Sequence, residues 1–190
     1  AAQPDRPTHT LASPYVRAQQ TARIALEAAG CADVCIDVDE RLREREFGIL
    51  DRLTTEGIRA RHPEQAAARA FLGKFYHRPP GGESWADVAL RVRSVIDSIG
   101  LHYAGERLLV VSHQVVIMIF RYLLERLSEQ DLLAIDKSNK VANCSVTVYE
   151  FDPSLSRFGG MTLKVFNDVS ALREEGEAVT SEPDAQVAPR

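Results

Sequence analysis

A short, almost uninterrupted apolar run in the second half of the chain constrains the fold most. Residues 107–112 read RLLVVS, and His113 follows at once. A run of this length, with no polar alternation, is typical of a strand in a parallel sheet that is covered on both faces. The next apolar stretch, 115–127, has the length of a helix. These residues predict a buried strand followed directly by a helix, with His113 at the turn between them.

Strand-like and helix-like segments alternate along the rest of the chain. This alternation predicts an α/β fold, a three-layer sandwich in which helices cover both faces of a mostly parallel central sheet. Ligands bind beyond the carboxyl ends of the strands in such sheets, and Ser13 and His113 each follow a predicted strand there. The apolar spacing predicts helices over 15–29, 54–75 (broken near Pro63) and 83–99, and strands over 8–12, 34–38, 145–151 and 161–166.

The distribution of charge indicates one domain and a tail. The 190 residues carry a formal net charge of −4. Segment 173–190 has five acidic residues and two arginines, so it accounts for −3 of that charge. We expect a single domain over residues 1–172 and a disordered acidic tail over 173–190. The nearly neutral body has no basic run that would favour nucleic acid or a membrane surface as a partner.

The three cysteines, Cys31, Cys35 and Cys144, form no CxxC pair, and no histidine lies at metal-ligand spacing from them. We therefore expect buried thiols in a reducing cytoplasm, with no bound metal and no cofactor. No apolar run approaches the length of a membrane span, and the first ten residues have no hydrophobic signal region. The expected location is cytoplasmic.

Three segments can supply catalytic groups, and each also has an ordinary structural explanation. Arg17, in SPYVRAQQTA (13–22), follows a strand and can grip a phosphate with its planar guanidinium, or it is a solvated surface arginine. His113 stands before a helix N-terminus, where an anion binds, or local backbone groups satisfy its ring. Glu44, in LREREFG (42–48), is a general acid if its pKa is raised, or a solvated loop carboxylate.

Together with PPGGESWADVALRVRSVID (79–97), these segments occur in an order that resembles the histidine phosphatase superfamily of phosphoglycerate mutase-like proteins. The resemblance is closer to the fructose-2,6-bisphosphatase-like and bacterial phosphatase members, and it covers about residues 8–151. It implies that Arg17 clamps the phosphoryl group. It also implies that Glu44 donates a proton to the leaving oxygen and that His113 assists the transferring phosphoryl group.

The resemblance also implies a substrate and a reaction. Tyr76, Arg78 and Gln114 are expected to contact a small phosphorylated metabolite. A nucleophilic histidine would take the phosphoryl group and water would release it, while cationic side chains stabilise the charge without a metal. The bisphosphatase pattern places an arginine five residues after the late histidine, but here that position is Met118, and the next arginine is Arg121. This difference disfavours fructose 2,6-bisphosphate as the substrate.

One part of the family pattern is missing from this sequence. The family opens with a strand that ends in Arg-His-Gly, whose histidine is the nucleophile, and no Arg-His-Gly occurs among the 190 residues. His9 lacks the neighbouring arginine and glycine. His62, His77 and His102 fall in predicted helices or turns and are expected to be exposed. We therefore expect a sheet without its N-terminal strand, and a truncated domain that does not turn over substrate covalently.

Three functions stay open at this point. The first is a phosphomonoester hydrolase domain whose native gene includes the missing motif. The second is a catalytically inactive pseudoenzyme that binds phosphate through Arg17 and His113. The third is a phosphotransferase of the phosphoglycerate mutase type. The GGES-type segment favours the phosphatase, while the physiological substrate and the oligomeric state stay open.

Overall fold

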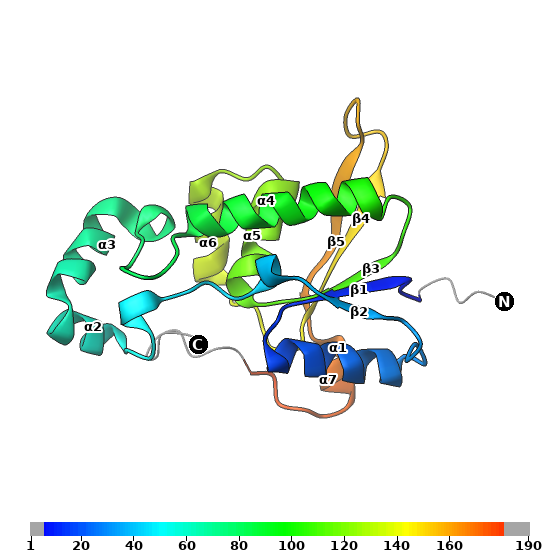
Figure 1. The fold of residues 1–190 in the computed structure, drawn as a ribbon, viewed down its shortest axis with the longest axis horizontal. Helices are drawn as coiled ribbons and strands as arrows, with labels where there is room; N and C mark the ends of the chain where they lie inside the picture. The colour runs from blue at the N-terminus through cyan, green and yellow to red at the C-terminus, as the bar shows by residue number, and fades with distance from the viewer. Residues whose placement is uncertain (1–5, 181–190) are drawn as a thin grey trace.

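The computed structural model describes residues 6–180 and has the expected layered α/β architecture (Figure 1). A parallel sheet of three strands has the order β2-β1-β3. Helix α1 lies against one face of this sheet and helices α4 and α5 lie on the other, so the sheet is the middle of three layers (Figure 1). The three strands are β1 (His9–Ala12), β2 (Ile36–Val38) and β3 (Leu108–Val111). The helices are α1 (Val16–Ala28), α2 (Thr55–Arg61), α3 (Pro63–Tyr76), α4 (Trp85–His102), α5 (Gln114–Leu124), α6 (Glu129–Ser138) and α7 (Ser170–Glu174), with short 3₁₀ turns η1 (Glu40–Leu42) and η2 (Gly48–Leu50).

The register of the sheet brings two distant segments together. The last residue of β1, Ala12, lies opposite Val38 of β2 and Val111 of β3. The backbone N–H of Ser13 donates to the carbonyl oxygen of Val111 at 2.9 Å. The residues that follow β1 and β3 therefore leave the same edge of the sheet side by side.

The late strands form a second, separate sheet. Strands β4 (Val146–Asp152) and β5 (Gly160–Asp168) pair with each other in antiparallel fashion. Within residues 6–180, β3 pairs with β1 alone. All four residues of β3 are only partly buried, whereas three of the four residues of β1 are fully buried. The parallel sheet thus ends at β3, whose second edge has no strand partner in the described chain.

Helix α4 forms the main wall of the hydrophobic core. Ser84 caps it: the Ser84 hydroxyl accepts from the backbone N–H of Asp87 at 3.1 Å, and the Asp87 carboxylate accepts from the Ser84 N–H at 2.8 Å. This capping box sets the start of the helix. Val88, Val92 and Val95 are fully buried on one face of α4 and belong to the same core cluster as residues of α5.

The arginine and methionine singled out on α5 have structural roles. Met118 is fully buried in the core. Arg121 is 7% exposed, donates to both carboxylate oxygens of Glu125 at 2.7 and 2.9 Å, and lies 4.0 Å from the ring centre of Phe166. Tyr149 of β4 donates to the same Glu125 carboxylate. Arg121 therefore connects α5 to the β4–β5 hairpin.

Parts of the fold differ from the sequence prediction. Helix α6 was not expected, and it begins where the Ser128 hydroxyl accepts from the Asp131 N–H. Within the expected tail 173–190, α7 extends to Glu174, and Asn143 donates to the Thr180 carbonyl oxygen at 2.8 Å, while residues 181–190 lie outside the described part of the chain.

The cysteines are not all buried. Cys31 is buried, but Cys35 and Cys144 are exposed, and all three are free thiols. The expectation of buried thiols is wrong for Cys35, which stands just before the edge strand β2, and for Cys144, which has a positive φ in the turn before β4. Both positions face solvent because the chain turns there.

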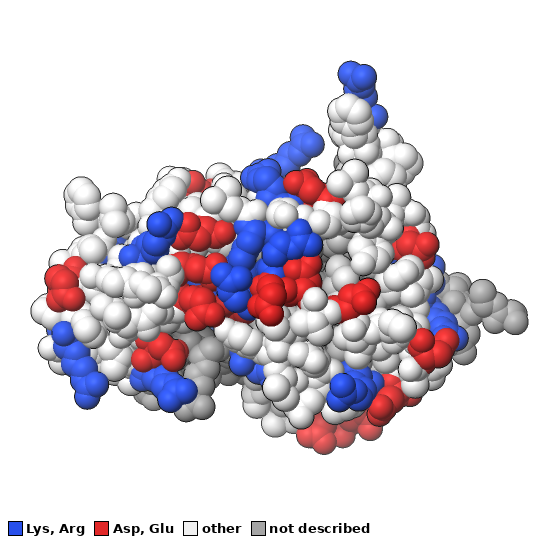
Figure 2. All heavy atoms as spheres, in the orientation of Figure 1, with Lys and Arg blue, Asp and Glu red and all other residues white. Residues whose placement is uncertain are grey.

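The surface agrees with the even charge pattern of the sequence. On the face shown in Figure 2, acidic and basic side chains are interleaved and form no patch of a single sign. None of the helices in the described residues is both long enough and apolar enough to cross a bilayer.

Candidate active site

Arg17 and His113 meet at the carboxyl edge of the parallel sheet. Arg17 lies in the first turn of α1, after β1, and His113 lies between β3 and α5. A terminal nitrogen of Arg17 donates to Nδ1 of His113 at 3.1 Å. The other ring nitrogen, Nε2, lies 2.7 Å from the hydroxyl of Ser13, which is fully buried. Residues 96 positions apart thus form one polar cluster.

The environment of His113 favours the neutral ring. The residue is 7% exposed. Burial, and then the positive charges of Arg17 and Arg91, lower the pKa of His113 to about 4. A neutral ring that accepts from Arg17 at Nδ1 carries its proton on Nε2, from which it donates to the Ser13 hydroxyl. The cluster therefore presents one permanent positive charge and one neutral imidazole at the site.

Glu44 is buried beside the start of α5. It is 1% exposed, and its carboxylate accepts from the backbone N–H of Arg45 at 2.7 Å and from that of Val115 at 3.5 Å. Val115 is the second residue of α5, so the carboxylate faces the N-terminus of the helix that follows His113. The alternative of a solvated loop carboxylate is excluded for Glu44.

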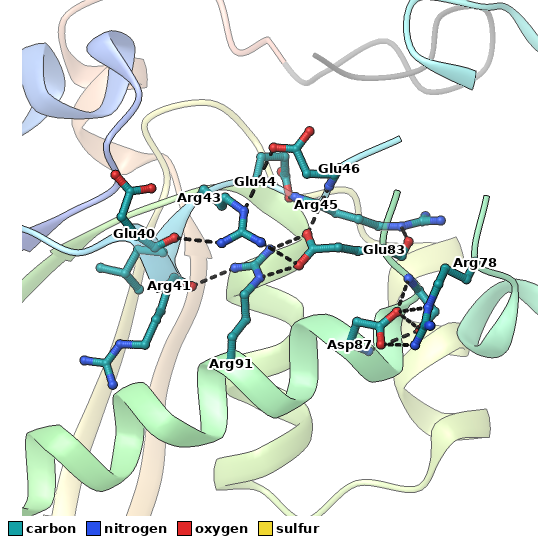
Figure 3. Close-up of polar contacts among 12 residues, drawn as sticks. Glu40, Arg41, Arg43, Glu44, Arg45, Glu46, Arg78, Glu83, Asp87 and Arg91 are labelled. Atoms are coloured by element: carbon teal, nitrogen blue, oxygen red, sulfur yellow. Dashed lines mark hydrogen bonds and ion pairs between the residues drawn. The ribbon is translucent and has the colours of Figure 1, made fainter. Parts of the chain in front are cut away.

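A network around Glu83 fixes the loop that carries Glu44 (Figure 3). Arg91 of α4 donates to both Glu83 carboxylate oxygens at 2.9 and 3.0 Å, and Arg43 donates to one of them at 3.1 Å. The backbone N–H of Glu46 donates to Glu83 at 3.1 Å. Hydrogen bonds with the two arginines and the Glu46 N–H lower the pKa of Glu83, against the effect of its burial, so it stays ionised.

Gly48 allows this loop to lie against the Pro79–Gly82 turn. It has a positive φ of 55°, and a Cβ placed on it would lie 2.1 Å from the carbonyl oxygen of Pro80. The Ile49 N–H donates to the same carbonyl at 3.0 Å, and Phe47 forms a β-bridge with Gly82. The two segments therefore pack backbone to backbone.

A cavity of about 440 Å³ opens next to Glu44, at the end of the molecule where α2 and α3 lie. Its lining combines apolar side chains with four cationic ones. The residues that line it include Glu44, Arg45, Phe47, Leu50, Ile58, Arg59, Arg69, Lys74, His77, Trp85, Gln114 and Asp136. Because Gln114 follows His113 directly, the cavity begins one residue from the imidazole.

The structure does not gather all six residues that the sequence singled out. Gln114 lines the cavity, where its amide donates to Asp136 at 3.5 Å. Tyr76 and Arg78 are absent from the lining. The Tyr76 hydroxyl contacts Glu129, and Arg78 forms an ion pair with Asp87 (Figure 3). Substrate contact by Tyr76 and Arg78 stays a prediction.

One histidine, His77, differs from its sequence prediction, and His9 lies apart from the cluster. His77 is 2% exposed, so its expected exposure is wrong. It lines the cavity, and Nε2 lies 3.2 Å from the Gln65 side-chain oxygen; α3 departs from helical geometry at Gly73, between these two residues. His9, at the start of β1, packs edge-on against the Tyr103 ring, 5.2 Å between centres. Since the cluster lies after the other end of β1, His9 stands at the opposite edge of the sheet.

The sequence also gave no signal for two members of the site. Arg45 and Arg69 acquire their positions from packing between segments distant in sequence. A buried arginine in a loop, such as Arg45, looks like any solvated arginine in the sequence alone.

Comparison with known proteins identifies the family of this chain. The family model for the histidine phosphatase superfamily, branch 1, matches residues 2–164. The chain belongs to that superfamily. A probable phosphoglycerate mutase GpmB from Erwinia tasmaniensis is 28% identical over 168 residues, which are 88% of this chain and 74% of that protein. The phosphoglycerate mutase-like protein 4 of Arabidopsis thaliana is 33% identical over 171 residues, or 89% of this chain and 68% of its own length.

Solved structures show the same fold. Bacillus stearothermophilus YhfR superposes with a TM-score of 0.72 and 26% sequence identity, covering 88% of this chain and 77% of its own. A mycobacterial glucosyl-3-phosphoglycerate phosphatase, solved in complex with inorganic phosphate, has a TM-score of 0.68 and 24% identity, with 86% and 78% of the two chains covered. Phosphatases and mutases thus both occur among the proteins that this chain resembles.

Proposed function

We propose that this chain forms the phosphate-binding and proton-donating part of a phosphomonoester hydrolase that works through a phosphohistidine intermediate. The observation that carries the proposal is the 3.1 Å contact between Arg17 and His113, with Ser13 behind the imidazole. A guanidinium and an imidazole held together at the carboxyl edge of a parallel sheet form a receptor for a tetrahedral anion.

Each residue has a role in this proposal. Arg17 binds two equatorial oxygens of the phosphoryl group and neutralises charge that builds up on them. His113 takes up a proton at Nδ1 once the anion displaces part of its contact with Arg17, and it donates that proton to a third oxygen. Glu44, buried at the start of α5, gives a proton to the leaving oxygen. The remainder of a small phosphorylated metabolite occupies the cavity beyond Glu44.

The nucleophile is the part of this reaction that the 190 residues do not include. No Arg-His-Gly occurs in the sequence, and His9 stands at the wrong edge of the sheet. We therefore propose that these residues alone bind phosphate but do not turn over a phosphomonoester. Reading the in-frame DNA before Ala1 for an apolar strand that ends in Arg-His-Gly distinguishes a hydrolase domain from a protein that lacks the motif altogether.

A phosphate-binding pseudoenzyme is the second candidate, because the contact between Arg17 and His113 can hold an anion without any chemistry. Both candidates keep the Arg17–His113 receptor, and only the hydrolase acquires turnover when the motif is supplied. A mutase-type phosphotransferase would differ from the hydrolase by keeping water from the phosphohistidine. We place the reaction in the cytoplasm, and the support is three free thiols, two of them exposed.

Calorimetric titration of the 190-residue chain with inorganic phosphate tests the proposed receptor. The Arg17→Ala variant is expected to lose affinity by about tenfold or more, since charge-assisted hydrogen bonds to an anion contribute about 1.5–3 kcal/mol each. Arg23→Ala is the matched control, because it removes an exposed arginine from the same helix. An equal loss in both variants would show that only the general charge matters, and the proposed site would be wrong.

A further inference from the structure

Tyr15 stands at the start of α1, and the needs of that helix do not explain a tyrosine there. It is the cap residue before α1 and is partly buried. Serine, threonine, asparagine and aspartate are preferred at a cap because their side chains accept from the first N–H groups of the helix. The Tyr15 side chain makes no capping hydrogen bond. It contacts residues of the candidate site instead.

The ring of Tyr15 contacts both members of the proposed phosphate receptor. The ring centre lies 4.7 Å from the guanidinium carbon of Arg17. The same ring packs edge-on against the imidazole of His113, with 5.1 Å between the ring centres and 61° between the planes. Arg17 is an exposed residue with a long, flexible side chain. The cation–π contact therefore restricts Arg17 to the orientation in which it donates to His113.

The hydroxyl of Tyr15 contacts the loop on the other side of the site. It donates to a carboxylate oxygen of Glu46 at 3.2 Å. Glu46 comes two residues after Glu44 in the same loop, and its own backbone N–H donates to Glu83 at 3.1 Å. Burial, and then the charge and the hydrogen bond of Glu46, raise the pKa of Tyr15, so its hydroxyl remains a donor at neutral pH. One side chain thus touches the receptor with its ring and the acid loop with its hydroxyl.

We propose that Tyr15 is a positioning residue, whose ring holds Arg17 in the phosphate-binding orientation and whose hydroxyl ties the Glu44 loop to the receptor. The receptor and the proton donor are then ordered relative to each other before substrate binds, which lowers the entropic cost of binding. The inference rests on the proposed function, because it takes Arg17 and His113 as the receptor and Glu44 as the acid. A tyrosine that only filled space would affect stability and leave phosphate affinity unchanged.

Two variants of Tyr15 separate the ring from the hydroxyl. In calorimetric titrations of the 190-residue chain with inorganic phosphate, Tyr15→Leu should lose affinity by about two- to fivefold, the size that a cation–π contact contributes at an exposed site. Tyr15→Phe keeps the ring and should bind phosphate as the unmodified chain does. Tyr103→Leu is the matched control, because Tyr103 also packs edge-on against a histidine, His9, but at the opposite edge of the sheet. It should lower the unfolding free energy without changing phosphate affinity.

Hydrogen exchange measures the tie between Tyr15 and the acid loop. The Arg45 N–H donates to the Glu44 carboxylate at 2.7 Å, so exchange of this amide reports how well that contact is kept. Tyr15→Phe should speed its exchange by about threefold or more, while the amide of Val92, in the buried face of α4, exchanges as before. Glu46→Ala should have a similar effect. The double variant should exchange no faster than the faster single variant, because both changes remove the same hydrogen bond.

The outcomes separate this inference from the proposed function. If Arg17→Ala loses phosphate binding and Tyr15→Leu does not, the ring does not position Arg17; the inference is then wrong and the proposed function stands. If Tyr15→Phe leaves the Arg45 amide unchanged, or if Tyr103→Leu weakens phosphate binding as much as Tyr15→Leu does, the inference is also wrong. If Tyr15→Leu does not fold, exchange in Tyr15→Phe still decides whether the loop is tied. If the unmodified chain does not bind phosphate, both proposals fail.

Discussion

At the scale of single residues, His113 shows how position determines chemistry. An ordinary histidine has a pKa near 6.5, and that of His113 is lowered to about 4 by burial and by the charges of Arg17 and Arg91. Arg17 can donate to Nδ1 only while the ring is neutral. The proposed anion receptor therefore depends on the same burial that keeps the imidazole uncharged.

This shift predicts a pH dependence of stability. Because His113 binds a proton more weakly when folded than when unfolded, its neutral form favours the folded state fully above pH 6.5. That contribution, of order 3 kcal/mol, declines as the pH falls from 6.5 and is lost at about pH 4. Urea unfolding at pH 7 and pH 4.5 should give a smaller difference in unfolding free energy for His113→Gln than for the unmodified chain.

NMR provides an independent check of the same residue. A ring titration of His113 with a midpoint near 4 is expected, and addition of phosphate should raise this midpoint, since an anion stabilises the protonated ring. A midpoint near 6.5 without phosphate would contradict the assignment of a buried, neutral imidazole.

At the scale of elements, the contact between the Glu44 loop and the Pro79–Gly82 turn depends on Gly48. Gly48→Ala should lower the unfolding free energy by about 2–4 kcal/mol, because a left-handed backbone costs an alanine about 1 kcal/mol and the new Cβ meets a carbonyl that cannot move easily. Gly30→Ala is the control. Gly30 also has a positive φ, but nothing lies within 4 Å of its Cβ position.

Urea unfolding of the two variants measures the difference. Gly30→Ala should cost about 1 kcal/mol, the conformational part alone. Equal losses for the two variants would mean that the loop and the turn do not pack as closely as described, and the position of Glu44 would then be in doubt.

The sequence predicted most elements because their periodicity reports burial directly. The apolar run 107–112 and the helical spacing of 83–99 correspond to β3 and α4 with boundary differences of one to three residues. Helix α6 was missed because charged residues surround its few apolar positions, such as Leu132, and it is held by packing on α5 and α3.

The sequence could predict the site residues that stand at the ends of strands. It could not predict the residues that the packing of α2 and α3 brings to the cavity. Arg17 and His113 follow β1 and β3, which are parallel neighbours in the sheet, so both residues lie at the same edge. Arg45, Arg69 and His77 meet only because α2 and α3 return over the end of the sheet. No local pattern in the sequence reports that path.

At the scale of the whole molecule, the edge of β3 that has no strand partner in the described chain predicts a place for a further strand. Its four residues, Leu108–Val111, are apolar, yet each is only partly buried. The β4–β5 hairpin does not pair with it and forms its own sheet. An additional strand beside β3 and parallel to it would pair these backbone groups and cover apolar surface. The carboxyl end of such a strand would lie at the same edge as Arg17 and His113.

We therefore expect an N-terminal extension to change both stability and activity. The extension consists of an apolar strand that ends in Arg-His-Gly and a flexible linker of about 20 residues, long enough for a parallel crossover. It should raise the unfolding free energy by satisfying the β3 edge, and it should produce turnover of p-nitrophenyl phosphate. The same extension with Arg-Gln-Gly should stabilise the chain equally without turnover, because the amide cannot accept the phosphoryl group.

If the Arg-His-Gly extension stabilises the fold and remains inactive, the strand position is right and the phosphate-binding pseudoenzyme becomes the better description. If neither extension stabilises the fold, β3 is not the edge at which a further strand adds.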